Sequence, residues 1–378
     1  MPPRVRHIIT GEYPPQTGGV SDYTELVANG LVAAGDEVHV WVPKCDAADC
    51  SSKYLQVHRL PDHFGPRALA FLSRALRAST ASSILVQYVP HAFGMKAMNV
   101  PFCLWLSSLR HRDVTLMFHE VMFPLYRGQR LKHRLLGSVT RVMARLACLG
   151  ASRIMVASAN WEAVLRGLGA TAPISWMPVP SNIPVVDDPA ATRAFRQRYT
   201  ASGSRLLGHF SRHSDYSIER LSELVPPLLA ADVHLSMVLV GVNSIEAHRR
   251  LTGTHSGLSD RLHATGVLAP REISCALSAC DLMIQPYSDG ISARRTTAMA
   301  AMAHGRAIAT NRGGATEALW ENSGAVAMAA SDDPLAMRTL VGETLAMSGA
   351  LCAYAHAAAE LYERRFALCH TIDALMAA

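Results

Sequence analysis

The chain has 378 residues, of which 49% are hydrophobic and 17% charged, and this length suits two domains rather than a single core. Its net charge of +6 is compatible with phosphate ligands or an anionic membrane surface, and is too weak to indicate a nucleic-acid partner. The longest apolar runs, such as 100–106, fall far short of the roughly 20 residues that a membrane-spanning helix needs.

The first half of the chain alternates short β-type runs with helical stretches. Strands are expected at 4–10, 37–43, 82–90, 113–120 and 152–158, and helices at 23–35 and 67–78 and before the last of these strands. Strands that alternate with helices favour a parallel sheet with crossover connections.

A proline-rich stretch then interrupts the pattern, and a second alternating set begins. Its strands are expected at 205–210, 235–241, 262–268, 281–287, 306–311 and 324–330. We therefore expect an N-terminal Rossmann-like domain at 1–183, a linker at 184–204, a C-terminal Rossmann-like domain at 205–350, and helices at 351–378 that pack back towards the first domain. Two such domains place a ligand cleft between them, at the carboxyl ends of their strands.

Paired glycines follow the first strand. Gly18 and Gly19 allow backbone N–H groups to approach a ligand at the start of a helix, which Ser21 or Asp22 is expected to cap. A turn that needs glycine explains the pair equally well. Neither a Walker loop nor a dinucleotide fingerprint is present.

Charged side chains follow two other strands. His119 and Glu120 end the strand at 113–120, where they face the expected cleft, although a histidine with a purely structural role is an equal alternative. Arg212 lies just beyond the strand at 205–210, and its guanidinium could bind a diphosphate with two hydrogen bonds or remain an ordinary surface group.

The loop after the strand at 281–287 carries the strongest indication of a site. It contains Asp289, Ser292 and the adjacent Arg294 and Arg295, and it leads into a small-residue helix beginning near Thr296. The N–H groups at a helix N-terminus and two arginines beside them act together on an anion. We therefore predict a phosphate-binding site here.

These residues belong to a wider pattern. The chain resembles retaining GT-B glycosyltransferases of the family 4 type, a group of bacterial glycosyl and mannosyl transferases, through the blocks 13–31, 118–120, 176–183, 265–290 and 301–319. The resemblance implies an α/β fold of two Rossmann-like parallel-sheet domains that face each other across a cleft. It also implies metal-independent hexosyl transfer from a UDP- or GDP-type sugar donor to a sugar or lipid-linked glycan, without a cofactor, in surface polysaccharide or glycoconjugate assembly.

The resemblance assigns roles to individual residues. The glycine pair would lie against the donor diphosphate or the acceptor, His119 beside the transferred sugar, and Arg212 on the diphosphate. Glu317 matches an acidic position of the family on the donor side, while Asp22 and Glu120 would lie on the acceptor side. The leaving phosphate would accept the acceptor proton, so no protein nucleophile is needed.

The chain also departs from the family. Two glutamates eight residues apart are replaced by Ser292 and Ala300, and a lysine by Ser217. Asp289, which with His119 is a catalytic candidate, could substitute only in a rearranged loop. Because the paired arginines are additions, we interpret the site as altered rather than silent. The alternatives are a non-catalytic nucleotide-sugar-binding or scaffold subunit of a polysaccharide assembly complex, and a GT-B sugar-nucleotide epimerase or hydrolase.

The segment 126–145 has six Lys and Arg residues and no acidic residue. Leu131, Leu135, Val139 and Met143 recur at a spacing of four, as on one face of a helix. Such a helix could contact an anionic membrane, or it could pack on the core with a solvated basic face.

The cysteines match no zinc-binding spacing, and most lie in apolar surroundings where a thiol behaves as a small hydrophobic group. They are Cys45, Cys50, Cys103, Cys148, Cys275, Cys280, Cys352 and Cys369. No segment of signal-peptide type opens the sequence. We expect reduced thiols, no metal and a cytoplasmic protein, with peripheral membrane contact at most.

Overall fold

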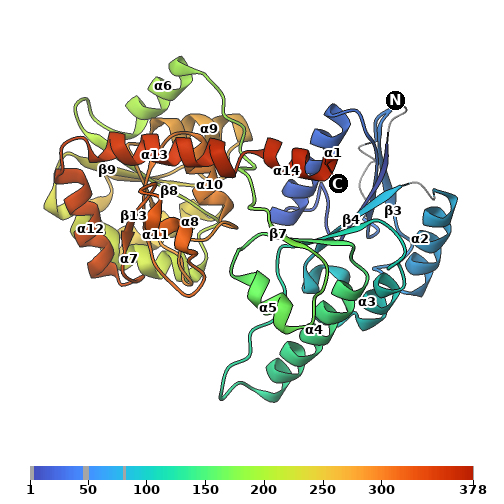
Figure 1. Ribbon diagram of the computed structural model, residues 1–378. Helices are drawn as coiled ribbons and strands as arrows, with labels where there is room; N and C mark the ends of the chain where they lie inside the picture. Colours follow the sequence, from blue (N-terminus) through green and yellow to red (C-terminus); the bar gives the residue numbers. More distant parts are fainter. Residues whose placement is uncertain (1–3, 46–50, 80–81, 378) are drawn as a thin grey trace. The chain divides into compact units, whose positions relative to one another are not determined.

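A computed structural model describes residues 4–45, 51–79 and 82–377 (Figure 1). The chain divides into two compact units: the first contains residues up to Pro178 together with Leu368 onwards, and the second runs from Val179 to Ala367. Each unit is an α/β layer structure with its own parallel sheet.

The first unit is built on a seven-stranded sheet with the order β3-β2-β1-β4-β5-β6-β7. Its strands are β1 Val5–Thr10, β2 Glu37–Val42, β3 Leu55–Arg59, β4 Ser83–Tyr88, β5 Val114–Phe118, β6 Arg153–Val156 and β7 Ile174–Trp176. Its helices are α1 Gly19–Ala33, α2 Pro66–Ala78, α3 Val100–Ser107, α4 Leu131–Leu149, α5 Trp161–Gly167 and α14 Leu368–Met376, with short 3₁₀ turns at Pro90–Phe93 and Met95–Ala97.

The second unit is built on a six-stranded sheet with the order β10-β9-β8-β11-β12-β13. Its strands are β8 Arg205–Phe210, β9 Leu235–Val240, β10 Leu262–Ala264, β11 Leu282–Gln285, β12 Ala307–Asn311 and β13 Ala327–Ala329. Its helices are α6 Pro189–Tyr199, α7 Asp215–Ala231, α8 Ser244–Thr254, α9 Pro270–Ala279, α10 Thr296–Ala303, α11 Ala318–Asn322, α12 Pro334–Ala346 and α13 Ala350–Arg365, with a 3₁₀ turn at Ser256–Leu258.

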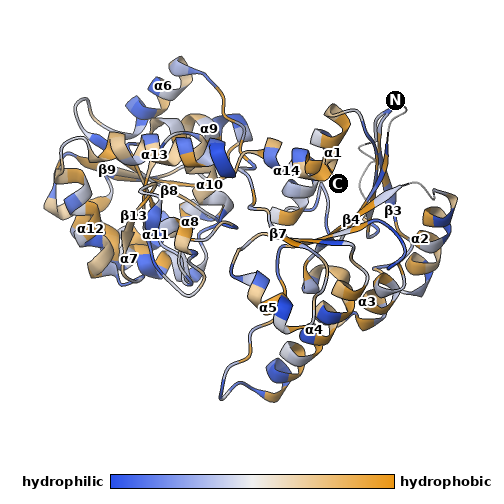
Figure 2. Cartoon of the chain, in the orientation of Figure 1, coloured by the Kyte–Doolittle hydropathy of each residue, from blue (hydrophilic) through white to orange (hydrophobic). Residues whose placement is uncertain are grey.

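The strands are buried because helices cover both faces of a parallel sheet. All six residues of β4 and all six of β9 are buried. Figure 2 shows the hydrophobic colour gathered on the strands and on parts of the helices. None of the described helices is long and apolar enough to cross a membrane. The seven described cysteines are free thiols, and Cys50 lies outside the described residues.

The strands expected in both halves are confirmed, as is the fold of two Rossmann-like domains. Two further strands, β3 and β7, were not predicted. In β3 polar residues follow each apolar one, and β7 is a three-residue edge strand with no buried residue. Neither gives the continuous apolar run by which a central parallel strand is recognised.

Three expectations need correction. The segment 184–204 is not an open linker, because it contains α6, whose Arg196 pairs with Asp281 at 2.8 Å within the second unit. Neither Ser21 nor Asp22 caps α1: this helix begins at Gly19, and the Ser21 hydroxyl donates to the carbonyl of Gln16. Of the C-terminal helices, only α14 joins the first unit.

Helix α14 packs on α1, at the other end of the chain. The close approach depends on Gly30, where an added Cβ would lie 2.6 Å from the Cδ1 atom of Ile372. The last helix of the chain therefore completes the surface of the first unit.

Candidate functional site

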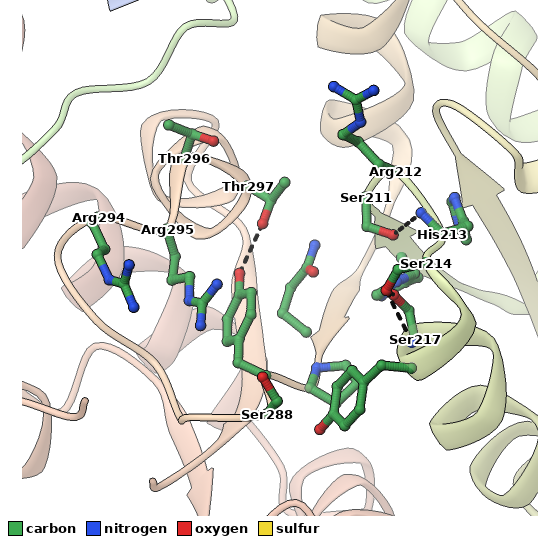
Figure 3. Close-up of a pocket in the computed structure, with 15 residues that line it drawn as sticks. Ser211, Arg212, His213, Ser214, Ser217, Ser288, Arg294, Arg295, Thr296 and Thr297 are labelled. Atoms are coloured by element: carbon green, nitrogen blue, oxygen red, sulfur yellow. Dashed lines mark hydrogen bonds between the residues drawn. The ribbon is translucent and has the colours of Figure 1, made fainter. Parts of the chain in front are cut away.

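A pocket of about 370 Å³ opens in the second unit at the carboxyl ends of β8 and β11 (Figure 3). The strand order reverses between these two neighbouring strands, and such switch points are where open α/β sheets bind ligands. The fifteen lining residues come from 209–217, 285–288 and 294–297, and none of them is Asp or Glu.

Two helices begin at the pocket. The side chain of Ser214 caps the 17-residue α7, while the eight-residue α10 begins at Thr296. Ser214, Thr296 and Thr297 all line the cavity. Since the first N–H groups of a helix lack intrahelical partners and carry partial positive charge, both ends favour an anion between them.

Three arginines line the same cavity. Figure 3 shows Arg212 on the α7 side and Arg294 and Arg295 on the α10 side. Arg212 is exposed, whereas the side chains of Arg294 and Arg295 are only 28% and 26% exposed. The pocket therefore combines three positive charges with two helix N-termini, which is the chemistry of a phosphate site.

Asp289 pairs with both arginines of the α10 side. Its carboxylate accepts a hydrogen bond from Arg294 at 2.8 Å and forms an ion pair with Arg295. The Arg295 guanidinium also lies 4.7 Å from the ring centre of Tyr287, whose hydroxyl lies 2.8 Å from that of Thr297. Burial lowers the pKa of Arg295 below that of a free guanidinium.

The replaced family positions are not in the pocket lining. Ser292 and Ala300 are fully buried, and Ala300 is one of the buried residues of α10. Glu317 is also buried, where it accepts hydrogen bonds from the Ala293 N–H at 3.1 Å and from the indole N–H of Trp320 at 2.8 Å. Ser292 and Glu317 therefore do not line this pocket, and their ligand contact stays a prediction.

The remaining predicted residues lie in the first unit. The strand order of its sheet reverses between β1 and β4, and Gly18 directly precedes α1 at the end of the loop that follows β1. A Cβ at Gly18 would lie 2.8 Å from the carboxylate oxygens of Glu12, whereas one at Gly19 would meet nothing within 4 Å. Because the Glu12 carboxylate is the far end of a flexible side chain and can move aside, this contact does not require glycine at position 18, and the ligand roles of the pair stay predictions.

His119 lies just after β5 and is 8% exposed. Its Nε2 atom is 2.7 Å from Oε1 of Gln87, and its ring packs edge-on against Tyr23. Burial lowers its pKa to about 4, so the imidazole is neutral at pH 7. The adjacent Glu120 is half-buried and lies 3.4 Å from Nδ1 of His91. Asp22 lies in the first turn of α1.

Sequence reasoning missed several lining residues, chiefly His209, Gln285 and Tyr287. His209 and Gln285 interrupt otherwise apolar strands near their carboxyl ends, in the runs LLGHF and LMIQ. A polar side chain at such a strand end was a usable indication, because the carboxyl ends of parallel strands form the binding edge of the sheet.

Comparisons with known proteins agree with this geometry. Residues 205–346 match the family model described as glycosyl transferases group 1. No curated protein matches the sequence.

Among solved structures, sucrose-phosphate synthase from Thermosynechococcus elongatus is similar, with a TM-score of 0.73 and 17% identity over 99% of this chain and 97% of that one. Anabaena HepE in complex with UDP and glucose has a TM-score of 0.66 and 16% identity, covering 99% and 98% of the two chains. WaaG, a glycosyltransferase involved in lipopolysaccharide biosynthesis, has a TM-score of 0.64 and 16% identity, covering 95% of each chain.

The two parallel sheets and the likeness to these solved structures show that the chain has the GT-B fold of glycosyltransferases. Within the second unit, residues 205–346 match the family model of glycosyl transferases group 1, which covers less than half of the chain. The resemblance found in the sequence is thereby confirmed.

Proposed function

We propose that the protein moves a hexosyl group from a nucleotide-diphosphate donor, of the UDP or GDP type, to a hydroxyl of a sugar or lipid-linked acceptor with retention of configuration. The observation that carries the proposal is the acid-free pocket lined by three arginines and two helix N-termini. HepE, which has the same fold, is described with UDP and with UDP-glucose. Surface polysaccharide or glycoconjugate assembly is the proposed setting.

The proposed chemistry depends on the negative charge that develops on the leaving diphosphate. When the glycosidic bond to the donor phosphate breaks, negative charge grows on the diphosphate, and Arg212, Arg295 and the N–H groups of α7 and α10 stabilise it. This stabilisation is larger in the transition state than in the bound donor, so it accelerates the step. The leaving phosphate takes the acceptor proton. A metal ion is not required, because the arginines supply the positive charge.

The proposed roles in the first unit are those of positioning. Neutral His119 would lie beside the transferred sugar, where an uncharged imidazole can exchange hydrogen bonds with hydroxyls without opposing the growing positive charge on the sugar. Gly18 and Gly19 would lie against the donor diphosphate or the acceptor, and Asp22 and Glu120 would lie on the acceptor side. In the second unit the Asp289 carboxylate pairs with two arginines, Arg294 and Arg295. Its proposed part in catalysis therefore begins only after the donor phosphates have bound these arginines in its place.

A panel of nucleotides tests the proposal. We expect one of UDP, GDP, ADP and dTDP at millimolar concentration to raise the melting temperature clearly. A ligand at 100 times its Kd adds about 2.7 kcal/mol of apparent stability. The matching sugar nucleotide should then release nucleoside diphosphate faster when a hydroxyl acceptor is present. Absence of any shift would favour a scaffold subunit, and acceptor-independent release would favour a hydrolase.

The surface around α4 supports a second proposal, contact with an anionic membrane. Leu131, Leu135 and Tyr126 are 81%, 56% and 66% exposed, whereas Met143 of the same predicted face is buried. Basic residues surround the exposed group, and no acidic residue occurs between Glu120 and Glu162. Exposed apolar side chains within a basic surface match a bilayer with anionic headgroups.

Charge reversal in α4 tests this contact. Replacing Arg130 and Lys132 together by Glu should weaken binding to vesicles with anionic lipid at least about 30-fold, since each basic side chain near such a surface contributes about 1 kcal/mol. Vesicle sedimentation measures the change. The matched control reverses the exposed Arg193 and Arg198 of α6, which carry the same charge. Equal binding by both double variants would remove the membrane contact.

A further inference from the structure

Three buried side chains of the pocket share one property: each uses its N–H on a backbone carbonyl and leaves an acceptor atom unpaired. They are His209, His213 and Gln285, which are 1%, 2% and 0% exposed. Among the described residues, the Nε2 atoms of the two histidines and Oε1 of Gln285 have no hydrogen-bond partner. Buried polar atoms without partners are rare, and each requires a reason.

The hydrogen bonds of the histidines fix their tautomers. Nδ1 of His209 lies 2.7 Å from the carbonyl oxygen of Ile284, and Nδ1 of His213 lies 3.0 Å from that of Val242. Since a carbonyl can only accept, both Nδ1 atoms carry the proton. Burial lowers the pKa of His209 to about 3 and also lowers that of His213, so each ring is neutral and its Nε2 atom is an acceptor.

Gln285 is oriented in the same way. Its amide nitrogen donates to the carbonyl of Phe210 at 3.2 Å, which leaves the amide oxygen as the unpaired atom. The rings of His209 and His213 lie 5.1 Å apart, and Phe210 follows His209 directly. The three acceptors therefore belong to one end of the pocket, at the carboxyl ends of β8 and β11. We call this group the acceptor patch.

The backbone of His213 adopts an energetically unfavourable conformation. Its backbone φ of 44° lies in the left-handed region, which is unfavourable for a residue with a Cβ. The hydroxyl of Ser211 accepts from its backbone N–H at 2.9 Å (Figure 3). The fold thus maintains a strained residue at the cavity wall, and the Nε2 acceptor of its ring is buried and unpaired.

The chemistry of the patch selects its ligand. Phosphate oxygens offer no hydrogen-bond donors, and a metal cation is disfavoured by the three arginines that line the same cavity. The remaining match is a neutral group with several O–H donors, covalently joined to an anion. A sugar attached to a diphosphate has this composition.

We propose that His209, His213 and Gln285 bind sugar hydroxyls of the donor nucleotide, either on its ribose or on the transferred sugar. This proposal rests on the proposed function. It assigns to the acceptor patch the hydroxyl contacts that Ser292 and Ala300, both fully buried away from the pocket, do not make. The patch determines specificity for a hydroxylated ligand, while the arginines bind the phosphates.

Calorimetry with two classes of ligand tests the assignment. The ligands are inorganic pyrophosphate, and UDP, GDP and ADP with their 2′-deoxy forms and their glucose or mannose conjugates. Gln285→Met and His213→Asn should each weaken binding of the preferred nucleotide or sugar nucleotide about tenfold, as expected for one lost hydrogen bond to a buried acceptor. Pyrophosphate affinity should change less than twofold. Asparagine tolerates the left-handed backbone, so His213→Asn remains foldable if Gln285→Met does not.

The ligands also separate the two sugars. If the patch binds ribose, the wild-type protein binds the 2′-deoxy nucleotide more weakly and the variants lose nothing further with it. If it binds the transferred sugar, only the sugar nucleotide loses affinity. An equal loss for pyrophosphate and nucleotide, or no loss for any ligand, would overturn the acceptor patch alone. Pyrophosphate binding without any nucleotide binding by the wild type would overturn the proposed function as well.

Discussion

Replacing Arg295 by alanine should weaken binding of the preferred nucleoside diphosphate about 10- to 150-fold, which corresponds to the 1.5–3 kcal/mol of a hydrogen bond to a charged group. Its guanidinium is three-quarters buried, is held against Tyr287, and lies at the start of α10, so little freedom is lost when a phosphate binds. Isothermal titration calorimetry measures the change. We expect Arg294→Ala to act in the same direction.

Controls separate phosphate binding from other effects. Arg249→Ala, on the exposed face of α8, removes the same charge from the second unit and should leave the affinity unchanged. Arg295→Lys should recover only part of the binding, because lysine lacks the planar fork. If Arg295 serves only to neutralise Asp289, then adding Asp289→Asn to Arg295→Ala would restore full affinity, and the phosphate role would be lost.

Acidification should destabilise the first unit well before its carboxylates are protonated. Burial, with nearby charges, lowers the pKa of His7 to about 4, and burial lowers that of His119 to about 4. In the unfolded chain each imidazole takes up a proton near pH 6.5, whereas the folded rings stay neutral down to about pH 4. Stability is therefore complete above pH 6.5 and falls as the pH drops from 6.5 towards 4.

The expected loss is large. Each histidine contributes about 1.4 kcal/mol per pH unit in this window, so the two together remove about 4 kcal/mol by pH 5 from a total that is typically 5–15 kcal/mol. Urea unfolding followed by tryptophan fluorescence reports mainly on the first unit, which contains four of the five tryptophans: Trp41, Trp105, Trp161 and Trp176.

One histidine substitution isolates the cause. Nδ1 of His7 accepts a hydrogen bond from the indole N–H of Trp41 at 3.1 Å, a role that a protonated ring cannot fill but a glutamine oxygen can. His7→Gln should therefore reduce the slope of stability against pH, while the same change at exposed His111 should not. An identical unfolding midpoint at pH 7 and pH 5 would contradict the argument.

The fold could be predicted because the same local pattern, a short apolar run, recurs in each central strand. Runs such as LSMVLV in β9 are buried on both faces and are therefore apolar throughout, which makes a central parallel strand recognisable. The edge strands β3 and β7 lack this property and were missed. The helix at 184–204 was also hidden, since α6 has no buried residue and its proline-rich start is typical of a linker.

The site could be predicted only in part. Arg294, Arg295 and Thr296 were found because charge next to an apolar helix is unusual in a sequence. The burial of Ser292 and Glu317 could not be foreseen, since it depends on how the loop packs on Trp320 and Ala293. The acceptor patch was equally hidden, because the direction of an imidazole or amide is set by carbonyls that approach from other strands and loops.

The placement of α14 has a consequence for biosynthesis. Domains usually fold in the order in which the ribosome releases them. Here the surface of α1 around Gly30 is covered by Ile372, so it stays uncovered until residues 179–367 have been translated. Translation of the N-terminal unit therefore begins first, but this unit can complete its fold only after α14 has been translated. A nascent chain that stalls before α14 leaves that apolar surface open to chaperones and proteases.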